Sequence, residues 1–505
     1  MIWLDRAIGW FSPEAEARRT RARVVTQRLR AVNGYDGAGK GRRNTWTRGR
    51  DTSANAENRA ALPILRARHR ELVRNNPYAA RAMSVLQSNI IGTGIRPRAV
   101  AEEGAEARRD QAQAAMLAWC ESTDIDYDGR HDLYGLQSLA VRTAKESGDA
   151  LLVRVTQRGG RSGIPLKVRL LEGDYLDHTK NGPMENGYAV QGVQFNKAHQ
   201  RVGYWLHQHH PGDALASLAP ITGSKLTPAE DVIHLYEQHR PGAVRGVPAG
   251  TSAVMRMKNL DDYQDARIEA QKSAACLVGV VTEPEPLGEG ERKADVLPDR
   301  LEPGMFPRLG PGESVEFNTP PTVAGHGEFV STEQHAVAIA YDVPYELLTG
   351  DLSEVNYSSM RMGYLQFLRS NDQYRWNVFI PTFGAGLARW FSDAYVLTGG
   401  NLDGITWDWA PPERELLDPA REVGPMILMN RAGYRSLRGT IRSTGVEPAD
   451  VLEEIAEERE WLKKRGIILT TDPALVSNAG VTQARQGDTG FPDPANDPGA
   501  GPGNE

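Results

Sequence analysis

The spacing of hydrophobic residues changes along the chain, and each change predicts a different kind of element. In residues 62–91, 111–121 and 136–146, apolar residues recur at the three- and four-residue spacing of an amphipathic helix. In residues 150–237, short runs rich in Val, Leu and Tyr alternate with turn residues such as Gly, Pro and Asp, which is typical of strands. The pattern therefore predicts an α+β fold with a strand-rich region between helices.

Particular residues predict where several helices begin. Pro77 follows "RNN" and predicts the start of a second helix, because the N–H that proline lacks is unpaired in a first turn anyway. The longest predicted helix runs from Thr251 to Cys276, about 39 Å at 1.5 Å per residue. Ser331, with Gln334 three residues later, has the spacing of a capping box and predicts another helix start.

The later part of the chain predicts two more helices and a tail. A polar, acidic stretch interrupts the helical pattern after Pro344, and a helix is expected from Ser358 to Pro381. Residues 448–465 predict a charged helix. Residues 471–505 are rich in Gly and Pro, and that composition predicts a disordered tail because it cannot bury a core.

Composition limits the class of protein without identifying it. The 505 residues are long enough for about three domains, and 40% of them are hydrophobic, as in globular proteins. Two cysteines, Cys120 and Cys276, make no disulfide framework. No stretch approaches 18 uninterrupted apolar residues, and the N-terminal residues lack a signal-peptide pattern.

Charge is distributed unevenly along the chain. The net charge is −6, but residues 1–50 hold 12 Lys and Arg against 4 Asp and Glu, which leaves −14 on the remaining 455 residues. A basic arm on an acidic body suggests a polyanion or an acidic partner. A solvated arm without a partner explains the same pattern, and the sequence leaves both interpretations open.

Two segments resemble ligand-binding motifs but depart from them at a required position. "GYDGAGKG", Gly34–Gly41, has the glycines and the lysine, Lys40, of a phosphate-binding loop, but Gly41 stands where a Ser or Thr should bind magnesium. "DIDYDGRHDLYG", Asp124–Gly135, has the early ligands of a calcium loop. Gly135 stands where a bidentate Glu is needed, which favours an acidic loop before a helix.

The sequence "HQHHPGD" contains the chain's one cluster of histidines. On a strand, His207 and His209 would point to the same side, and Asp213 or His234 would be a third ligand. The alternative hypothesis for function is therefore a metal-dependent, DNA-processing hydrolase that uses the cluster His207, His209 and His210. Histidines at a strand end beside a Pro-Gly turn are the favoured interpretation. No specific enzyme motif was found elsewhere in the chain.

Several longer segments resemble the lambda-type portal proteins of tailed phages. The resemblance extends from about Tyr35 to Arg465, and "VPYELLTGDLSEVNYSSMR" (residues 343–361) is its most specific part. The other matching segments are "YDGA", "TSANAE", "LVRNNPYAARA", "IGTGI", "DVIHLYEQHRPGAVRGVP" and "LDDYQDA". The resemblance implies a portal fold with wing, stem, clip and helical crown, assembled as a ring.

The family's layout implies an order of parts along this chain. In sequence order they are a basic N-terminal arm (1–60), a wing (61–250), a first stem helix (251–276), a clip (277–330), a second stem helix (331–345), a tunnel loop (346–358), helices returning to the wing (359–430), a crown (431–470) and a tail (471–505).

The resemblance also implies a function and partners. Such a protein forms a dodecameric ring at one capsid vertex, through which double-stranded DNA is packaged and later ejected. The implied partners are the terminase large subunit, the major capsid and scaffold proteins, and the head-tail adaptor, with no cofactor and no membrane. It would not be an enzyme, and it would be found in the virion and, during assembly, in the host cytoplasm.

The implied DNA-contacting segment is short and acidic. Its candidate residues are Asp351, Leu352, Ser353, Glu354, Val355, Asn356 and Tyr357, and none of them is Lys or Arg. Lys and Arg hold phosphates, whereas Asp351 and Glu354 repel them. The segment is therefore suited to contact moving DNA without binding it tightly. Either Ser358 or Ser359 is expected to cap the helix that follows.

Overall fold

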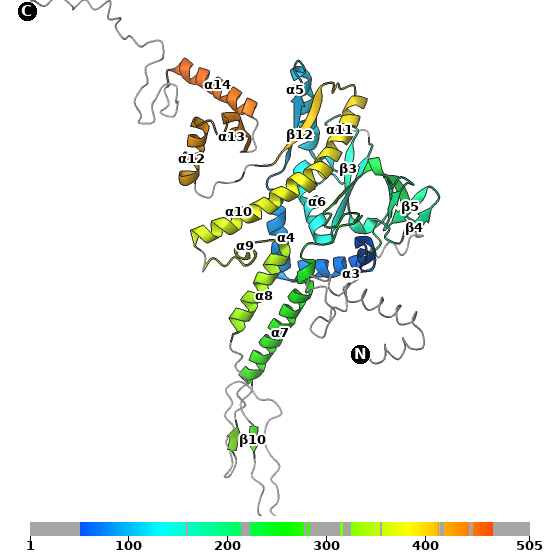
Figure 1. The fold of residues 1–505 in the computed structure, drawn as a ribbon, viewed down its shortest axis with the longest axis vertical. Coiled ribbons are helices and arrows are strands. Elements are labelled where there is room, and N and C mark those ends of the chain that lie inside the picture. The colour runs from blue at the N-terminus through cyan, green and yellow to red at the C-terminus, as the bar shows by residue number, and fades with distance from the viewer. Residues whose placement is uncertain are drawn as a thin grey trace, which may run out of the picture. The chain divides into compact units, whose positions relative to one another are not determined.

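A computed structural model describes ten parts of the chain (Figure 1). They are residues 51–157, 160–213, 223–276, 280–282, 314–316, 325–353, 356–412, 414, 419–443 and 448–467. The chain divides into two compact units, Met1–Ala56 and Glu57–Glu505. The description below concerns the second unit and the start of its first helix, which begins at Ala54.

The two helices that begin the described chain meet at a proline. Helix α3 (Ala54–Asn75) and helix α4 (Pro77–Ile90) are separated by Asn76, whose side chain accepts hydrogen bonds from the first backbone N–H groups of α4. The prediction that Pro77 opens a helix is confirmed. Helix α3 begins at Ala54, before the predicted residue 62. The apolar pattern missed these first turns because they are mostly polar and partly exposed.

Two further helices pack around small antiparallel sheets. Helix α5 (Glu106–Cys120) lies on strand β1 (Arg96–Ala101), which pairs with β12 (Ile405–Ala410) from the far end of the sequence. Helix α6 (Leu133–Ser147) ends at Gly148, whose φ of +94° suits glycine. A Cβ at Gly148 would lie 2.6 Å from the carbonyl oxygen of Gly246, so this close approach requires glycine.

The strand-rich region forms two antiparallel sheets. The first has the order β3-β2-β9, and the second has the order β4-β5-β6-β7-β8. Their strands are β2 (Asp149–Val155), β3 (Lys167–Glu172), β4 (Gly182–Met184), β5 (Gly187–Val190), β6 (Val193–Phe195), β7 (Arg201–Leu206), β8 (Lys225–Pro228) and β9 (Val232–Tyr236). Together with the helices, these sheets confirm the α+β prediction.

Two helices lie side by side after the sheets (Figure 1). Helix α7 (Val254–Cys276) follows a short 3₁₀ turn at Thr251–Ala253, as predicted, and helix α8 spans His326–Tyr341. Arg256 of α7 donates to Glu333 of α8 at 2.9 Å. Between the helices in sequence, the short strands β10 (Val280–Thr282) and β11 (Ser314–Glu316) pair antiparallel.

The prediction that Ser331 starts a helix is wrong. Helix α8 begins five residues earlier, at His326, after Gly325 in a left-handed conformation, and Ser331 lies inside it. Glycines on both sides of His326 obscured this start, because glycine is disfavoured within helices. At its other end the helix stops at Asp342, before Pro344.

One long helical segment crosses the molecule after α9 (Tyr345–Thr349). Helix α10 (Tyr357–Tyr374) continues into a π-helical stretch, Arg375–Gly384, and then into α11 (Ala385–Leu397) (Figure 1). The prediction that Pro381 ends the helix is therefore wrong. The wider π turn accommodates the proline ring, which in a regular α-helix would clash with the preceding turn.

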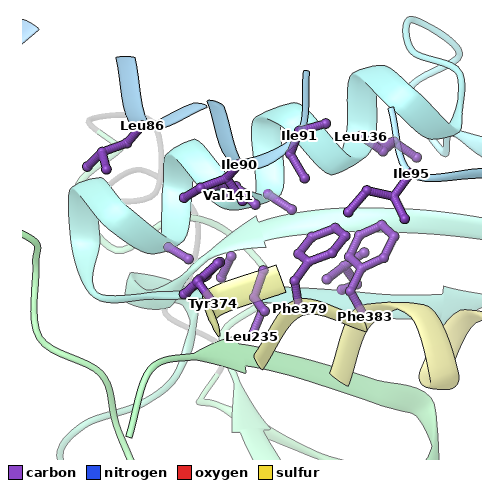
Figure 2. Packing of buried hydrophobic residues seen from close by; sticks show 14 of the residues in the cluster. Leu86, Ile90, Ile91, Ile95, Leu136, Val141, Leu235, Tyr374, Phe379 and Phe383 are labelled. Atoms are coloured by element: carbon purple, nitrogen blue, oxygen red, sulfur yellow. The ribbon is translucent and has the colours of Figure 1, made fainter. Parts of the chain in front are cut away.

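The π-helical stretch carries the centre of the main core (Figure 2). Phe379 and Phe383 are fully buried, and their rings stack with centroids 4.7 Å apart. They pack with residues of α4, α6 and β9, including Ile90, Val141 and Leu235. The core thus joins helices from both halves of the chain to the three-stranded sheet.

The last described helices are α12 (Pro419–Arg431), α13 (Leu437–Ser443) and α14 (Pro448–Arg465), each in contact with the next. The predicted charged helix at 448–465 is confirmed. Within the described ranges, no helix has the length and apolar character that crossing a membrane requires. Cys120 is buried and free, and burial raises the pKa of its thiol to about 12.

Candidate functional site

The acidic segment leaves helix α9 through a defined turn. Gly350 follows the helix with φ +77°, and the hydroxyl of Thr349 accepts the N–H of Asp351 at 3.2 Å. The Asp351 carboxylate accepts both the hydroxyl and the N–H of Ser353, at 2.6 and 3.0 Å. These two hydrogen bonds lower the pKa of Asp351, so its side chain is negatively charged at neutral pH.

The same segment returns to a helix through a capping residue. Asn356 is the N-cap of α10, and its side-chain oxygen accepts the N–H of Ser359 at 2.9 Å. The prediction that Ser358 or Ser359 caps the helix is wrong, because Asn356 stands at the cap and the Ser359 hydroxyl donates to its backbone carbonyl. Glu354, Val355 and the side chain of Tyr357 lie outside the described residues.

Helix α9, which precedes the acidic segment, packs against α8 and α4. The ring of Tyr345 stacks on His335 of α8, with centroids 3.9 Å apart and planes within 6°. Leu348 is buried, and Arg81 of α4 donates to the carbonyl of Leu347 at 3.0 Å. The segment therefore begins on a fixed base, whereas Leu352 beyond that base is 58% exposed.

The charge around the segment is negative. Tyr345–Met360 contains Glu346, Asp351 and Glu354 and no Lys or Arg. The next arginine, Arg361, donates to Glu422 of α12 at 3.1 Å. The segment between α9 and α10 is thus acidic and partly apolar in sequence, and a helix lies at each of its ends. We call residues 350–356 the acidic loop.

Comparison with known proteins identifies the family. The sequence profile of the phage portal proteins of the lambda family matches residues 40–375, about two thirds of the chain. The chain belongs to this family. The resemblance noted in the sequence is therefore confirmed, and the α+β fold described above is that of a portal subunit.

Named relatives agree with this assignment. The chain is 26% identical over 474 residues to a probable portal protein of Halomonas phage phiHAP-1, covering 87% of this chain and 88% of the relative. It is 23% identical over 523 residues to portal protein B of Escherichia phage lambda, covering 91% and 95%.

Solved structures are more distant. A chain from the neck of a native gene transfer agent particle, computed with twelvefold symmetry, is 16% identical with a TM-score of 0.45, and the match covers 75% of this chain and 94% of that one. An HK97-family phage portal protein from Corynebacterium diphtheriae is 11% identical with a TM-score of 0.29, covering 68% and 94%.

The histidine cluster of this portal subunit does not converge on one point. His207 Nε2 lies 3.9 Å from Asp177, and His210 Nε2 lies 3.6 Å from Glu172. His209 is exposed, and His234 is buried elsewhere against Asp149. The proposed ligands are therefore divided among different partners.

Among the described residues, one group has the spacing to hold an ion: Glu172, Asp174 and His210. The two carboxylates of this group already bind a guanidinium, because Arg70 donates to Glu172 at 2.5 Å and to Asp174 at 2.6 Å. This positive charge takes the part that a metal would play. The arrangement supports an ion pair between α3 and the end of β3, and it gives no support to a metal-dependent hydrolase.

The calcium-like segment uses its carboxylates on the backbone. Asp126 accepts N–H groups from Asp128, Arg130 and His131 at 2.9–3.2 Å. Burial raises the pKa of Asp126, but these N–H groups outweigh it and bring the pKa below its usual value. Asp132 caps α6, so the favoured interpretation, an acidic loop before a helix, agrees with the structure. The segment Gly34–Gly41, with Lys40, lies outside the described residues.

A buried ionic cluster was missed by sequence analysis. Asp149, at the start of β2, is fully buried and pairs with Arg66 of α3 at 2.5 Å and with Arg245. His234 Nε2 lies 3.2 Å from the same carboxylate, and burial lowers the pKa of His234 to about 4, so the ring is neutral. Arg245 also donates to the carbonyl of Gly173 at 2.6 Å.

This buried cluster connects four separate segments of the subunit. Burial raises the pKa of Asp149, but the two guanidiniums outweigh burial and hold that pKa far below its usual value. A charged carboxylate therefore persists at the junction of α3, β2, β9 and the segment that leads to α7. No local sequence motif predicts such a cluster, because Arg66, Asp149, His234 and Arg245 lie 83 or more positions from one another except for His234 and Arg245.

Proposed function

We propose that twelve copies of this chain form a closed ring and that double-stranded DNA passes through its channel during packaging and ejection. The acidic loop is the proposed surface that the DNA meets. The observation that carries this proposal is the loop itself, which is acidic, has no Lys or Arg, lies between two helices, and is exposed at each of its described residues.

The chemistry of the loop suits a sliding contact. Each Lys or Arg that neutralises a phosphate releases counterions and adds affinity that falls with salt. A ring repeats every contact, so even weak phosphate binding by one subunit would be multiplied around the DNA. The charged Asp351 opposes such binding, and the exposed Leu352 adds an uncharged contact.

The remaining helices fit the parts of a portal subunit. In this proposal α7 and α8 are the stem, the residues between them are the clip, and α13 and α14 belong to the crown. The sheets with α10, α11 and α12 are the wing. The side-by-side packing of α7 and α8, with the last residues of α7 and the first residues of α8 at the same end of the pair, supports this assignment (Figure 1).

Exposed apolar residues support association between subunits. Ile339 of α8, Met362 of α10 and Leu397 of α11 are between 71% and 80% exposed in the single chain. Scattered apolar residues are ordinary on a surface, but three such large side chains on well-formed helices are suited to burial by a neighbouring copy.

The proposed partners follow from this role. The ring would dock the terminase large subunit during packaging and the head-tail adaptor afterwards, and it would contact the major capsid and scaffold proteins at one vertex. It would act in the host cytoplasm during assembly and remain in the virion. In this proposal the chain has no catalytic site, since members of the family are generally structural and DNA movement is driven by the terminase.

Solution mass tests the ring. We expect the purified chain to sediment, at micromolar concentration, as a species of about 670 kDa, twelve times the 55.5 kDa subunit, because a heterologous interface with cyclic symmetry closes on itself. Native mass spectrometry would give the number of copies directly. A stable monomer over a range of salt concentrations would contradict the proposal.

A further inference from the structure

Helix α14 presents an acidic surface to solvent. From Glu453 to Arg465 every residue except Leu462 is exposed, whereas Val451, Leu452 and Leu462 are half-buried and Pro448 is buried. Glu453, Glu454, Glu457 and Glu458 fall within about 140° of one another around a helix of 3.6 residues per turn. We call these four glutamates the acidic face. Trp461, 51% exposed, lies on the same side of the helix by this geometry.

The preceding helices carry the opposite charge. Residues 419–443 contain five arginines and one acid, Glu422. Arg438 and Arg442 are four residues apart and so share one side of α13, and Arg435 stands just before that helix. We call Arg435, Arg438 and Arg442 the basic face. Residues 448–459, at the start of α14, carry five acids and one arginine, and the basic residues Lys463, Lys464 and Arg465 follow in its last turn. The charge opposite to that of residues 419–443 therefore lies in the first part of α14.

These two faces do not neutralise each other within one chain. Helices α13 and α14 are in contact, yet within the described residues no ion pair joins the basic face to the acidic face. A helix with so few buried side chains gains little stability from its own chain, because most helical stability in proteins comes from packing. Both observations indicate a surface completed by another molecule.

We propose that the acidic face of one copy packs against the basic face of the next copy, so that α13 and α14 link neighbouring subunits head to tail. This inference rests on the proposed ring. A heterologous interface requires two different and complementary surfaces on every subunit, and these two faces provide them. A nucleic acid would fit the basic face, but the acidic face would repel it, and a second copy satisfies both.

The residue types at these faces also fit a protein–protein contact. Trp and Arg are the side chains most often found to dominate binding energy at such interfaces. Trp461 accompanies the acidic face, and the basic face consists of arginines. On α12, which contacts α13, the exposed Ile427 and Leu428 offer apolar surface. Complementary charges set the order in which subunits join, and apolar side chains add buried area.

Charge reversal tests the proposal. The lysine variant carries Glu453→Lys, Glu454→Lys, Glu457→Lys and Glu458→Lys, and the glutamate variant carries Arg435→Glu, Arg438→Glu and Arg442→Glu. Each variant alone places like charges across every interface, so we expect most rings to be lost at low ionic strength. The double variant restores opposite charges, and so does an equimolar mixture, which should form rings of alternating subunits.

The measurement is the fraction of chains in rings, from sedimentation velocity at two salt concentrations. Recovery in the double variant and in the mixture separates lost attraction from misfolding. A variant with glutamine at the four acidic positions should be intermediate, because it removes charge without reversing it. Circular dichroism monitors the helical content of every variant.

Two results would overturn the inference. One is that either the lysine variant or the glutamate variant has the same fraction of chains in rings as wild type at low salt. The other is that neither the double variant nor the mixture regains rings. A failure of the proposed ring can be distinguished from a failure of this contact between subunits. If the wild-type chain forms no ring, the proposed function fails. If wild type and both single variants form rings equally well, the ring stands and this contact is wrong.

Discussion

A subunit carrying Asp351→Lys and Glu354→Lys should assemble normally but package DNA at least about ten times more slowly at low salt. The two changes replace both acids of the acidic loop by Lys in every copy of the ring. Each new contact between a lysine and a phosphate releases counterions, and the affinity gained in this way decreases steeply as salt rises. The contact between loop and DNA would change from sliding to holding.

The length of packaged DNA over time, at two ionic strengths, checks this expectation. The defect should be relieved by raising the salt concentration. The matched control carries Asp351→Asn and Glu354→Gln, which removes the negative charges without adding positive ones and should slow packaging far less. A normal packaging rate for the lysine-substituted loop at low salt would show that DNA does not meet this loop.

Replacing Asp149 by alanine should destabilise the subunit by about 3–5 kcal/mol. The change leaves the buried guanidiniums of Arg66 and Arg245 without their carboxylate, and unpaired buried charge is strongly unfavourable. Stabilities of folded domains are about 5–15 kcal/mol, so this loss would remove a large part of the total. We expect low soluble yield or a much lower melting temperature.

Thermal unfolding, compared with that of Asp351→Ala, measures the effect. Asp351 is an exposed acid, and its replacement should change stability by less than about 0.5 kcal/mol. If Asp149→Ala melted at the same temperature as this control, the buried cluster would not hold α3, β2 and β9 together.

Features set by nearby residues were predictable from the sequence. Asn76 and Pro77 define the start of α4 through contacts within four positions, and short runs rich in Val, Leu and Tyr between turn residues predicted the strands. The helix at 448–465 was likewise predicted with its observed limits. In each case the predictive signal lies within a few neighbouring residues, although a strand such as β2 also pairs with the distant β9.

Three predictions about helix limits failed for identifiable reasons. Ser331 has the spacing of a capping residue, but the α8 helix already exists before it. Pro381 stands in a π-helical stretch whose neighbours, Phe379 and Phe383, are held by the main core, so packing outweighs the local preference of proline. At Asn356 two good capping residues were nearby, and the sequence does not rank them.

The functional features also differ in how far the sequence predicted them. The acidic loop was found through its resemblance to a family and its lack of Lys and Arg, both visible in one stretch of sequence. The buried cluster around Asp149 depends on residues distributed from Arg66 to Arg245, and each of them alone resembles an ordinary surface charge. Only the folded arrangement brings them together.

Photo-crosslinking from the acidic loop tests most directly the claim that DNA passes through this ring against this loop. A photoreactive benzoylphenylalanine replaces Leu352, which is 58% exposed, and, as a control, Ile64 on α3, which is 53% exposed. Heads are illuminated while packaging is stalled with DNA in the channel. We predict crosslinks to DNA from position 352 and few or none from position 64. Equal crosslinking from both positions, or none from position 352 in heads that contain DNA, would contradict the account.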